Sequence, residues 1–544
     1  MKEIKNSKAV IRLPILLSIA IATGILIGAT MVGSGDGKKD LYQSIYKFRE
    51  IVSYIDRNYV DEVNTDELVE NAINDMLEKL DPHTSYIPAK DQELVSSQLQ
   101  GKFEGIGIEF NIFHDTIYVV SPLSGGPSEK VGLKAGDKIV KVDGETVAGI
   151  GITNRGVFDR LRGAKGSEVT VSIKRRNVNE LMDFNIERDK IPQHSVDVAY
   201  MVDDEIGYLK VNRFTATTYD EFKVALQQLR DQGMSKLMLD LTGNPGGYMD
   251  KAVNMADEFL SGNKMIVYTK GKESRYNAEH RAYRKGQFEQ GSLIVLIDAG
   301  SASASEIVSG AIQDNDRGLI VGRRSFGKGL VQMPISLNDG SELRLTISRY
   351  YTPSGRSIQK PYELGHQEEY YEDFSTRIRN GELYSADSME VADSLLFETL
   401  KGRTVYGGGG IMPDVFVPLD STDNSAYLNQ LFYTNTIREY ALLYYEENRA
   451  DLEKYSLEDY RVNFNVDENM LSALIELGEA NGATYNEQQY MKSRVFIQTF
   501  LKAQIARGVW DNEGFFPIYN QTNEIFLEAL KLFDEADAIA ENGD

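Results

Sequence analysis

The segment from Val198 to Tyr351 constrains the fold most, because apolar runs and amphipathic runs alternate along it. The apolar runs that predict strands are Lys236–Leu241, Leu293–Ile297 and Leu319–Val321, and the amphipathic runs that predict helices are about 248–260 and 304–313. Strand–helix–strand units with short connections predict a mainly parallel sheet covered by helices. We therefore expect an α/β fold for this part of the chain.

Polar or glycine-rich loops follow the three predicted strands. They are residues 242–247 (Thr-Gly-Asn-Pro-Gly-Gly), 300–306 (Gly-Ser-Ala-Ser-Ala-Ser-Glu) and 325–329 (Ser-Phe-Gly-Lys-Gly). The carboxyl ends of parallel strands lie at one edge of an open sheet, and ligands bind in the crevice beyond that edge. The three loops are therefore expected to form one site.

Each loop taken alone has an ordinary structural interpretation. Short Ser/Ala runs are usually helix N-caps, and Asn-Pro-Gly-Gly and Gly-Lys-Gly are usually turns. The spacing from Gly322 to Lys328 is that of a P-loop, but Gly329 occupies the position where Ser or Thr would bind magnesium. No helix-forming run follows, so nucleotide binding is disfavoured.

A histidine base is disfavoured as well. Gly-x-Ser-x-Gly is absent around Ser303. His280 lies in the charged segment Glu279-His280-Arg281, which has the pattern of a solvated surface. The other four histidines show no evident relation to the three loops: His83, His114, His194 and His366. So few histidines also disfavour a multi-histidine metal site.

The three loops together resemble those of the carboxyl-terminal processing proteases, also called tail-specific proteases, which are exported serine peptidases with an embedded PDZ domain. The resemblance extends from Leu41 to about Val417 and includes three further motifs: Asp-Pro-His-Thr-Ser-Tyr at 81–86, Tyr-Thr-Pro-Ser-Gly-Arg at 351–356 and Gly-Gly-Gly-Gly-Ile-Met-Pro-Asp at 407–414. It implies a Ser/Lys endopeptidase without a cofactor or a metal. The alternative is a non-catalytic PDZ scaffold or adaptor of the cell envelope with a degenerate protease core.

In that family the nucleophile is the middle serine of the Ser-Ala-Ser-Ala-Ser run, and the general base is a lysine 25 positions later, as 303 and 328 are here. The resemblance therefore implies that Ser303 and Lys328 are the catalytic pair. The family's glutamine, which follows the lysine, matches Gln332 and would orient the amine. An aspartate that supports the site in some members matches Asp314.

The chemistry of these residues agrees with a Ser/Lys pair. A serine hydroxyl needs an adjacent base, and lysine is a base only when its pKa falls from about 10.4, as burial can cause. Apolar neighbours that can bury the amine are Phe326, Leu330 and Val331. Ser303 begins a predicted helix, whose free N–H groups can stabilise an oxyanion. The candidates for this oxyanion hole are the N–H of Ala304 and one N–H from Gly246 or Gly247.

Residues 101–190 have the texture of a small β-rich module. Strands are predicted at Thr116–Val120, Lys138–Val142 and Glu168–Lys174. With Gly132–Asp137 and the turn at Asp143-Gly144, they resemble a PDZ domain. Such domains bind a peptide C-terminus by strand addition, so substrates with free apolar C-termini are expected. The expected carboxylate-binding loop is Gly105, Ile106, Gly107 and Ile108. Arg162 resembles a family position thought to couple the PDZ domain to the active site, and a surface arginine is the alternative.

The N-terminus predicts the compartment. Four cations at Lys2, Lys5, Lys8 and Arg12 precede an uncharged stretch from Leu13 to Gly33, which is close to the roughly 20 residues that span a bilayer as a helix. The positive flank predicts that the rest of the chain faces the periplasm or another extracytoplasmic space. An uncleaved inner-membrane anchor is favoured, and a cleaved signal peptide followed by secretion is the alternative.

Composition sets the remaining expectations. The formal net charge of −23 repels phosphate backbones, so nucleic acid is not an expected partner. The absence of cysteine excludes thiol nucleophiles and disulfides. At 544 residues several domains are expected, in the order 1–40 anchor and linker, 41–100 helical module, 101–190 PDZ domain, 191–420 α/β serine protease core, and 421–544 helical extension. The extension has 9 Lys and Arg against 22 Asp and Glu, and it is expected to dock on the core, oligomerise the chain or bind an adaptor.

Overall fold

The computed structural model describes residues 18, 23, 36–123, 125–389 and 393–541 of the chain. The chain divides into two compact units, residues 1–77 and residues 78–544. The predicted anchor at 13–33 falls outside the described residues, apart from Ser18 and Thr23. Within the described part of the chain, we find no helix with the length and apolar character needed to cross a membrane.

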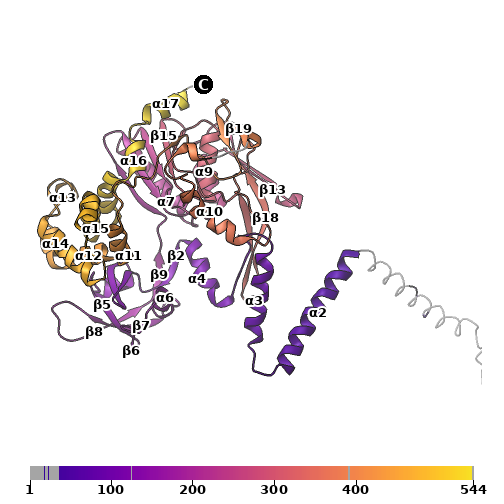
Figure 1. The fold of residues 1–544 in the computed structure, drawn as a ribbon, viewed down its shortest axis with the longest axis horizontal. Helices are drawn as coiled ribbons and strands as arrows, with labels where there is room; N and C mark the ends of the chain where they lie inside the picture. Colours follow the sequence, from indigo (N-terminus) through magenta and orange to yellow (C-terminus); the bar gives the residue numbers. More distant parts are fainter. Residues whose placement is uncertain (1–17, 19–22, 24–35, 124, 390–392, 542–544) are drawn as a thin grey trace, which may run out of the picture. The chain divides into compact units, whose positions relative to one another are not determined.

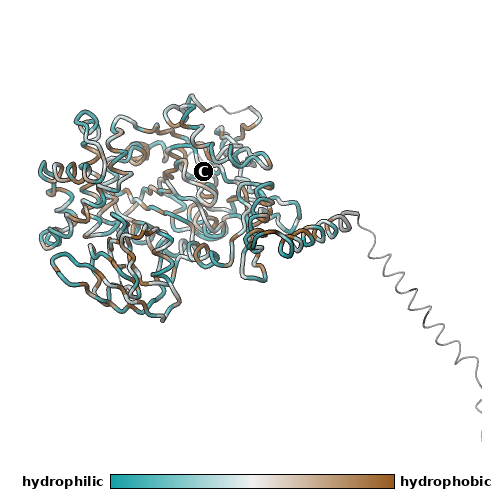
Figure 2. The backbone as a smooth tube through the Cα atoms, turned by 60° about the horizontal axis from the view of Figure 1, so that its bottom comes forward, coloured by the Kyte–Doolittle hydropathy of each residue, from teal (hydrophilic) through white to brown (hydrophobic). Residues whose placement is uncertain are grey.

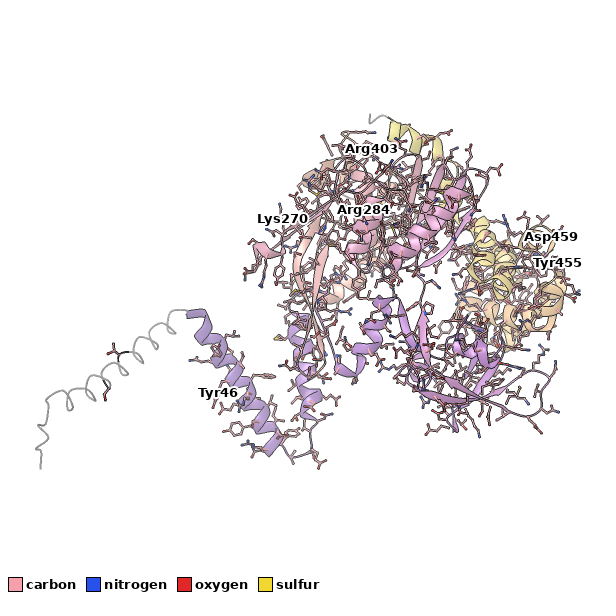
Figure 3. The ribbon with its side chains drawn as sticks, turned by 180° about the vertical axis from the view of Figure 1, so that it is seen from behind. Tyr46, Lys270, Arg284, Arg403, Tyr455 and Asp459 are labelled. Atoms are coloured by element: carbon pink, nitrogen blue, oxygen red, sulfur yellow. The ribbon has the colours of Figure 1, made fainter. Side chains whose placement is uncertain are left out.

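The helices in the described part of the first unit from residue 36 on are α2 (Asp36–Asn58) and α3 (Thr65–Glu78), whose last residue belongs to the second unit, and the sequence predicts helical periodicity there. Polar and apolar residues alternate at short intervals along α2 (Figure 2). Several large side chains of α2 are exposed, among them Tyr42 and Tyr46 (Figure 3).

Residues 101–192 form the β-rich module that the alternating pattern predicts (Figure 1). Its sheet has the order β3-β4-β5-β7-β8, with β6 paired to β5, and β2 pairs with β9 in a separate ribbon. The strands are β2 (Lys102–Gly105), β3 (Ile108–Phe113), β4 (Thr116–Pro122), β5 (Lys138–Val142), β6 (Glu145–Thr146), β7 (Glu168–Lys174), β8 (Met182–Glu187) and β9 (Asp189–Pro192). Two helices complete the module, α5 (Pro127–Val131) and α6 (Asn154–Leu161).

The α/β region is built on a six-stranded sheet of order β10-β11-β12-β15-β16-β21. All neighbouring pairs from β11 to β21 are parallel, as predicted, and only β10 runs antiparallel to its neighbour. The strands are β10 (Val196–Met201), β11 (Ile206–Val211), β12 (Lys236–Asp240), β15 (Ser292–Ile297), β16 (Leu319–Gly322) and β21 (Val415–Phe416). The helices that follow β11, β12 and β15 are α7 (Thr218–Asp231), α8 (Met249–Asp257) and α9 (Ala304–Asp314).

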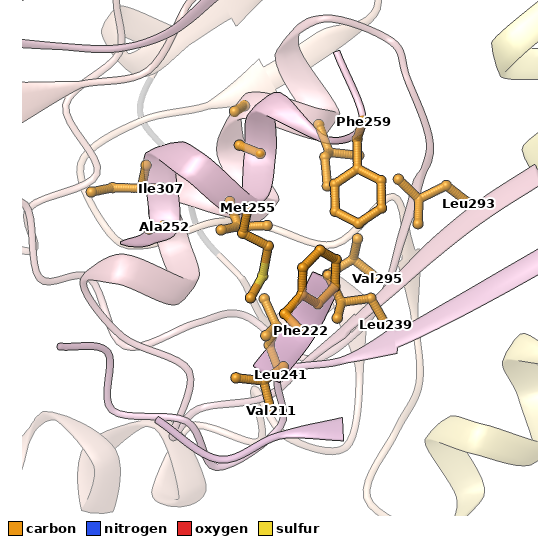
Figure 4. Close-up of a cluster of buried hydrophobic side chains, with 14 of the residues drawn as sticks. Val211, Phe222, Leu239, Leu241, Ala252, Met255, Phe259, Leu293, Val295 and Ile307 are labelled. Atoms are coloured by element: carbon orange, nitrogen blue, oxygen red, sulfur yellow. The ribbon is translucent and has the colours of Figure 1, made fainter. Parts of the chain in front are cut away.

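Both faces of this sheet are buried, which explains why its strands are almost continuously apolar. Leu239 and Val295 face the helices and pack with Phe222, Met255 and Phe259 in one core cluster (Figure 4). The alternate residues on the same strands belong to a second cluster with the C-terminal helices α16 (Glu524–Ala529) and α17 (Phe533–Glu541), and they include Met238, Ile294 and Leu296. The end of the helical extension therefore covers the second face of the sheet.

A second, antiparallel sheet was not predicted from the sequence. Its order is β1-β18-β13-β14, with β17 also paired to β18. The strands are β1 (Ser85–Ile87), β13 (Met265–Gly271), β14 (Ala278–Arg281), β17 (Leu330–Ser336) and β18 (Glu342–Tyr351). Because β1 pairs with β18, residues 85–87 of the predicted helical module are part of this sheet. The helix α4 (Ala89–Gln100) follows β1.

Short elements connect the second sheet to the C-terminal helices. They are α10 (Gln367–Arg379), β19 (Leu396–Glu398) and β20 (Thr404–Tyr406). The predicted helical extension then contains α11 (Ala426–Tyr433), α12 (Thr436–Leu452), α13 (Leu457–Asn463), α14 (Glu468–Ala480) and α15 (Glu487–Tyr519). Figure 3 labels Tyr455, which precedes α13, and Asp459, in the first turn of that helix. These five helices share their own hydrophobic cluster, so they form a packed region.

We expect Phe222→Ala to destabilise the α/β region by about 3–5 kcal/mol, because it leaves a cavity in the core. Phe222 is fully buried and lies 5.8 Å from Phe259, ring centroid to centroid. Urea unfolding followed by circular dichroism measures the effect. Val224→Ala is the matched control, since Val224 is 59% exposed on the same helix and its loss should cost less than about 0.5 kcal/mol. Equal losses in the two variants would contradict this packing.

Candidate functional site

Three loops at the carboxyl ends of β12, β15 and β16 meet, as the sequence predicts. The backbone carbonyl of Asn244 accepts hydrogen bonds from the Ala302 N–H at 3.0 Å and the Ser305 hydroxyl at 2.9 Å, which joins the first two loops. The Phe326 N–H donates to the Ser301 carbonyl at 2.9 Å, which joins the second and third loops. The three loops therefore form one connected edge.

Ser303 is the one serine of its run that reaches the cleft described below. Ser301 and Ser305 are fully buried, and their hydroxyls donate to the carbonyls of Leu241 and Asn244. Ser303 precedes α9 with φ +53° and ψ −109°, a backbone conformation that residues other than glycine rarely adopt. Such a sharp turn between a strand and a helix presents a side chain at the top of the sheet.

Glu306 connects the serine loop to the lysine loop, and sequence reasoning missed it. Its carboxylate accepts hydrogen bonds from the Ser303 N–H at 2.7 Å, the Gly327 N–H at 2.7 Å and the Lys328 N–H at 2.9 Å, and also from the Ser325 hydroxyl at 2.5 Å. The side chain is fully buried, and burial raises the pKa of Glu306 against the effect of these donors. The Ser-x-x-Glu spacing of a capping box was the sequence signal that could have identified it.

Lys328 and Ser303 line the same cleft, whose volume is about 730 Å³. Burial of its amine lowers the pKa of Lys328, which is the condition for a neutral lysine base. Leu330 and Val331 line this cleft as expected, but Phe326 instead packs edge-on against Tyr370 at 5.9 Å. Ser303 and Lys328 share this cleft, and among the described residues no hydrogen bond joins the Ser303 hydroxyl to the Lys328 amine.

The glycines before α8 keep the space beside Ser303 open. A Cβ atom on Gly246 would lie 2.8 Å from the Ser303 Cβ and 2.9 Å from the Ala304 nitrogen, and one on Gly247 would lie 2.0 Å from the Phe214 carbonyl oxygen. The Gly246 N–H donates to the Asn244 side chain at 2.9 Å, so of the two glycines Gly247 is the better oxyanion donor. Ala304 begins α9, where N–H groups have no partner within the helix.

Gln332 lies in the same cleft on β17. Its amide donates to the Thr346 hydroxyl at 3.3 Å, and that hydroxyl donates to the Asp81 carboxylate at 3.0 Å. Asp81 also accepts the N–H groups of His83 and Thr84, both at 2.9 Å. The Asp-Pro-His-Thr motif is therefore connected to Gln332 through one hydrogen-bonded side chain.

The prediction that His83 is unrelated to the site was wrong. His83 lines the cleft with Ser303 and Lys328, and its Nε2 lies 2.8 Å from the Tyr370 hydroxyl. Burial first, and then the nearby positive charge of Lys328, lower the pKa of His83 to about 3. His83 is therefore neutral near pH 7. His83 is far from the three loops in sequence, so no sequence pattern indicates that it lies near them. It reaches the cleft because the adjacent strand β1 pairs with β18 of the second sheet.

Asp314 is not brought to the serine and lysine. It ends α9, the helix that Ser303 begins, and its carboxylate accepts from Arg356 at 2.7 Å and from the Ser354 N–H at 3.0 Å. Its contacts instead fix the chain after β18 to the end of α9. Tyr350, which the sequence did not single out, is closer to the site, because its hydroxyl donates to the carbonyls of Ser303 and Lys328.

The β-rich module contains a second groove of about 360 Å³ between β3 and α6. All four residues of the predicted carboxylate-binding loop line it: Gly105, Ile106, Gly107 and Ile108. Val157, Phe158 and Leu161 of α6 make its opposite wall apolar. Arg162 lies at one end, with its guanidinium 4.5 Å from the Phe158 ring centroid and donating to the Ser97 hydroxyl at 3.1 Å. Arg162 is thus a partly buried link between α6 and α4.

Within the described ranges, no cluster of three His, Asp or Glu side chains is placed to hold a metal ion. The first cleft brings together a hydroxyl, an amine with a lowered pKa and the backbone N–H groups around them. This set suits attack on a carbonyl carbon.

Comparison with known proteins adds four family matches. The model of peptidase family S41 matches residues 205–366, and a PDZ domain model matches residues 105–186. The N-terminal domain model of the activating protease CtpB matches residues 28–91. Residues 427–511 match a family of unknown function.

Curated relatives agree with these matches. The chain is 37% identical over 350 residues to a carboxy-terminal-processing protease of Bartonella bacilliformis, covering 63% of this chain and 80% of that protein. It is 32% identical over 339 residues to the carboxy-terminal processing protease CtpA of Bacillus subtilis, covering 62% and 70%. Among solved structures, a photosystem II D1 C-terminal processing protease is 30% identical, covering 57% of this chain and 89% of that one, with a TM-score of 0.32.

We expect the Lys328 amine to react with an amine-acylating reagent at a lower pH than an ordinary exposed lysine, because burial lowers its pKa. A group with a lowered pKa becomes neutral, and therefore nucleophilic, earlier as the pH rises. Mass spectrometry of the peptide containing Lys328, over a series from neutral to alkaline pH, measures this. A titration midpoint near 10.4, the value for an unperturbed lysine, would contradict the prediction.

Proposed function

The chain belongs to the carboxy-terminal processing proteases of peptidase family S41, serine peptidases that here carry a PDZ domain, and we propose that Ser303 and Lys328 are its catalytic pair. One observation carries this assignment. Of the three serines in the run, only Ser303 opens into the cleft that also contains the Lys328 amine. Glu306 supports the pair by binding the backbone N–H of both residues.

The proposed reaction has two steps. The Ser303 Oγ attacks the peptide carbonyl carbon while the neutral Lys328 amine takes its proton. The N–H groups of Ala304 and Gly247 stabilise the oxyanion. The C–N bond then breaks, and the protonated Lys328 gives its proton to the leaving amine. Water hydrolyses the acyl-enzyme with Lys328 again as the base. Gln332, which lines the same cleft, orients the amine.

Substrates are proposed to be polypeptides whose free apolar C-termini bind the PDZ groove. Backbone N–H groups of the loop 105–108 hold the carboxylate, and the last residues add as a strand beside β3. The apolar wall of α6 favours apolar tails. Arg162 is proposed to couple this groove to the protease, since it contacts α4, whose Ser96 and Leu99 line the cleft.

The location is proposed from the first 33 residues. Their cations and uncharged stretch support an inner-membrane anchor, with the protease facing the periplasm or another extracytoplasmic space. Envelope proteins are then the expected substrates. Cleavage of a signal peptide, followed by secretion, is the alternative, and N-terminal sequencing of the mature protein separates the two.

We expect Ser303→Ala and Lys328→Ala each to reduce cleavage of an unfolded protein by at least about 10³-fold, because either change removes a reacting group. His280→Ala is the control, since His280 lies on β14 and does not line the cleft. Hydrolysis of a denatured substrate measured by gel and by released peptide reports the effect. Full activity in Lys328→Ala would exclude the proposed pair.

Cleavage should depend on the C-terminal carboxylate of the substrate. A peptide with an apolar tail and a free carboxylate should be cleaved faster than its amidated twin, because only the free acid accepts hydrogen bonds from the loop 105–108. Ile108→Glu should abolish this difference, since it places a charge in the groove. Equal rates for the two peptides in the unmodified enzyme would show that the carboxylate is not recognised.

A further inference from the structure

One face of α12 contacts the PDZ domain. Glu439, Leu442 and Glu446 are spaced by three and four residues, so they lie on one side of this helix. This helix belongs to residues 427–511, the part of the chain that matches a family of unknown function. The contacts of this face of α12 therefore give information about the function of residues 427–511.

The centre of the contact is apolar. Leu442 is 8% exposed and forms a small buried cluster with Phe113 and Tyr118 of the PDZ domain, against which Ala135 also packs. The Phe113 and Tyr118 rings meet edge to face at 5.2 Å. Leu442 is not a member of the hydrophobic cluster that holds the C-terminal helices together. Its burial is therefore provided by the PDZ domain.

Polar contacts and ion pairs surround this apolar centre. The Glu439 carboxylate lies 2.9 Å from the His114 ring, and Arg507 of α15 pairs with Glu109 of β3 at 3.0 Å. Arg176 forms an ion pair with Glu447. Two of these contacts place a carboxylate of the acidic C-terminal region against His114 or Arg176 of the PDZ domain, and the third places Arg507 against Glu109. Residues 101–190 have 14 Lys and Arg against 13 Asp and Glu, whereas residues 421–544 have a net charge of −13.

The Glu446 side chain of α12 lies close to the backbone of Gly136 in the PDZ domain. Gly136 has φ +84°, and a Cβ atom placed on it would lie 1.0 Å from the Glu446 Oε1. Glu446 therefore occupies the space that any other residue at position 136 would fill. Such a fit indicates a specific contact between two surfaces, in addition to charge attraction.

The same C-terminal region is bound to the protease sheet. Phe526 packs on Tyr208 with ring centroids 5.4 Å apart, and Asn520 donates to the Tyr200 hydroxyl at 3.0 Å. No residue of 421–541 lines the peptide groove, and none of 102–190 lines the Ser303 cleft, among the residues that the structure describes. The contact thus leaves both binding sites accessible.

We propose that the helical C-terminal region is a docking platform for the PDZ domain of the same chain. Through α16 and α17 it is fixed to the protease sheet, and through the face of α12 it holds the PDZ domain at a set place with its groove open and the Ser303 cleft uncovered. A tail bound in the groove is then presented to the cleft from a constant position. This last consequence rests on the proposed recognition of C-terminal tails, whereas the docking itself does not.

The test is a distance measurement on the full chain. The variant Asp183→Cys/Val224→Cys places one cysteine in the PDZ domain and one on α7, both at exposed positions. Because the chain has no cysteine of its own, a thiol-specific spin label reacts only at these two sites. Pulsed electron resonance should give one narrow distance distribution. Leu442→Asp should broaden it, because a charge cannot remain in the apolar cluster. Ala450→Asp is the matched control, since it adds the same charge at an exposed position of α12 and should leave the distribution narrow.

An unchanged narrow distribution in Leu442→Asp would overturn the proposal. If thermal melting shows that this variant does not fold, charge reversals at the ion pair of Arg507 and Glu109 test the docking instead. Arg507→Glu should broaden the distribution, and adding Glu109→Arg should narrow it again. Failure of either change would also overturn the proposal.

Kinetics test the presentation of tails separately. Leu442→Asp should raise KM severalfold for the free-acid peptide and leave KM for the amidated peptide unchanged, because only the first uses the PDZ groove. Equal effects on both peptides would refute this part. If the unmodified enzyme does not distinguish the two peptides, tail recognition fails while the distance measurement still decides the docking.

Discussion

The carboxylate of Glu306 accepts hydrogen bonds from four donors on two loops, and the geometry of the candidate site depends on it. Hydrogen bonds to a charged group contribute about 1.5–3 kcal/mol each, so together they offset much of the cost of burying a carboxylate. They fix the backbone of Ser303, which has an unfavourable φ, and the backbone of Lys328. A strained backbone persists only where its surroundings determine its conformation, and the hydrogen bonds of Glu306 help to determine that of Ser303.

Most of the α/β fold was predictable because its signal is local. The strands β12, β15 and β16 and the helices between them follow from apolar and amphipathic runs, and their parallel order follows from the connections. The meeting of the three loops followed from the same topology. The second sheet was not predicted, because β1 and β18 are distant in sequence and their pairing leaves no local signal, although Leu343, Leu345 and Ile347 alternate with polar residues along β18 as in a strand.

The same difference between local signals and long-range pairing decides which site residues could be predicted. The resemblance to a known family identified Ser303 and Lys328, and a capping-box spacing could have identified Glu306. His83 could not be placed in the cleft, nor Asp81 beside Thr346, since the pairing of β1 with β18 brings both residues there. Asp314 was expected to support the site only from the family resemblance. The length of α9 separates it from Ser303, and its partner is Arg356.

The pairing of β1 with β18 also has a consequence for biogenesis. Ser85 pairs with Arg344, so a chain made from its N-terminus must wait for more than half of its synthesis before this sheet can close. Contacts of such long sequence separation form slowly. The cleft cannot be complete before then, because Asp81, Thr346 and Gln332 join across that sheet. A chain of this topology therefore passes through more than half of its synthesis before this part of the cleft can form.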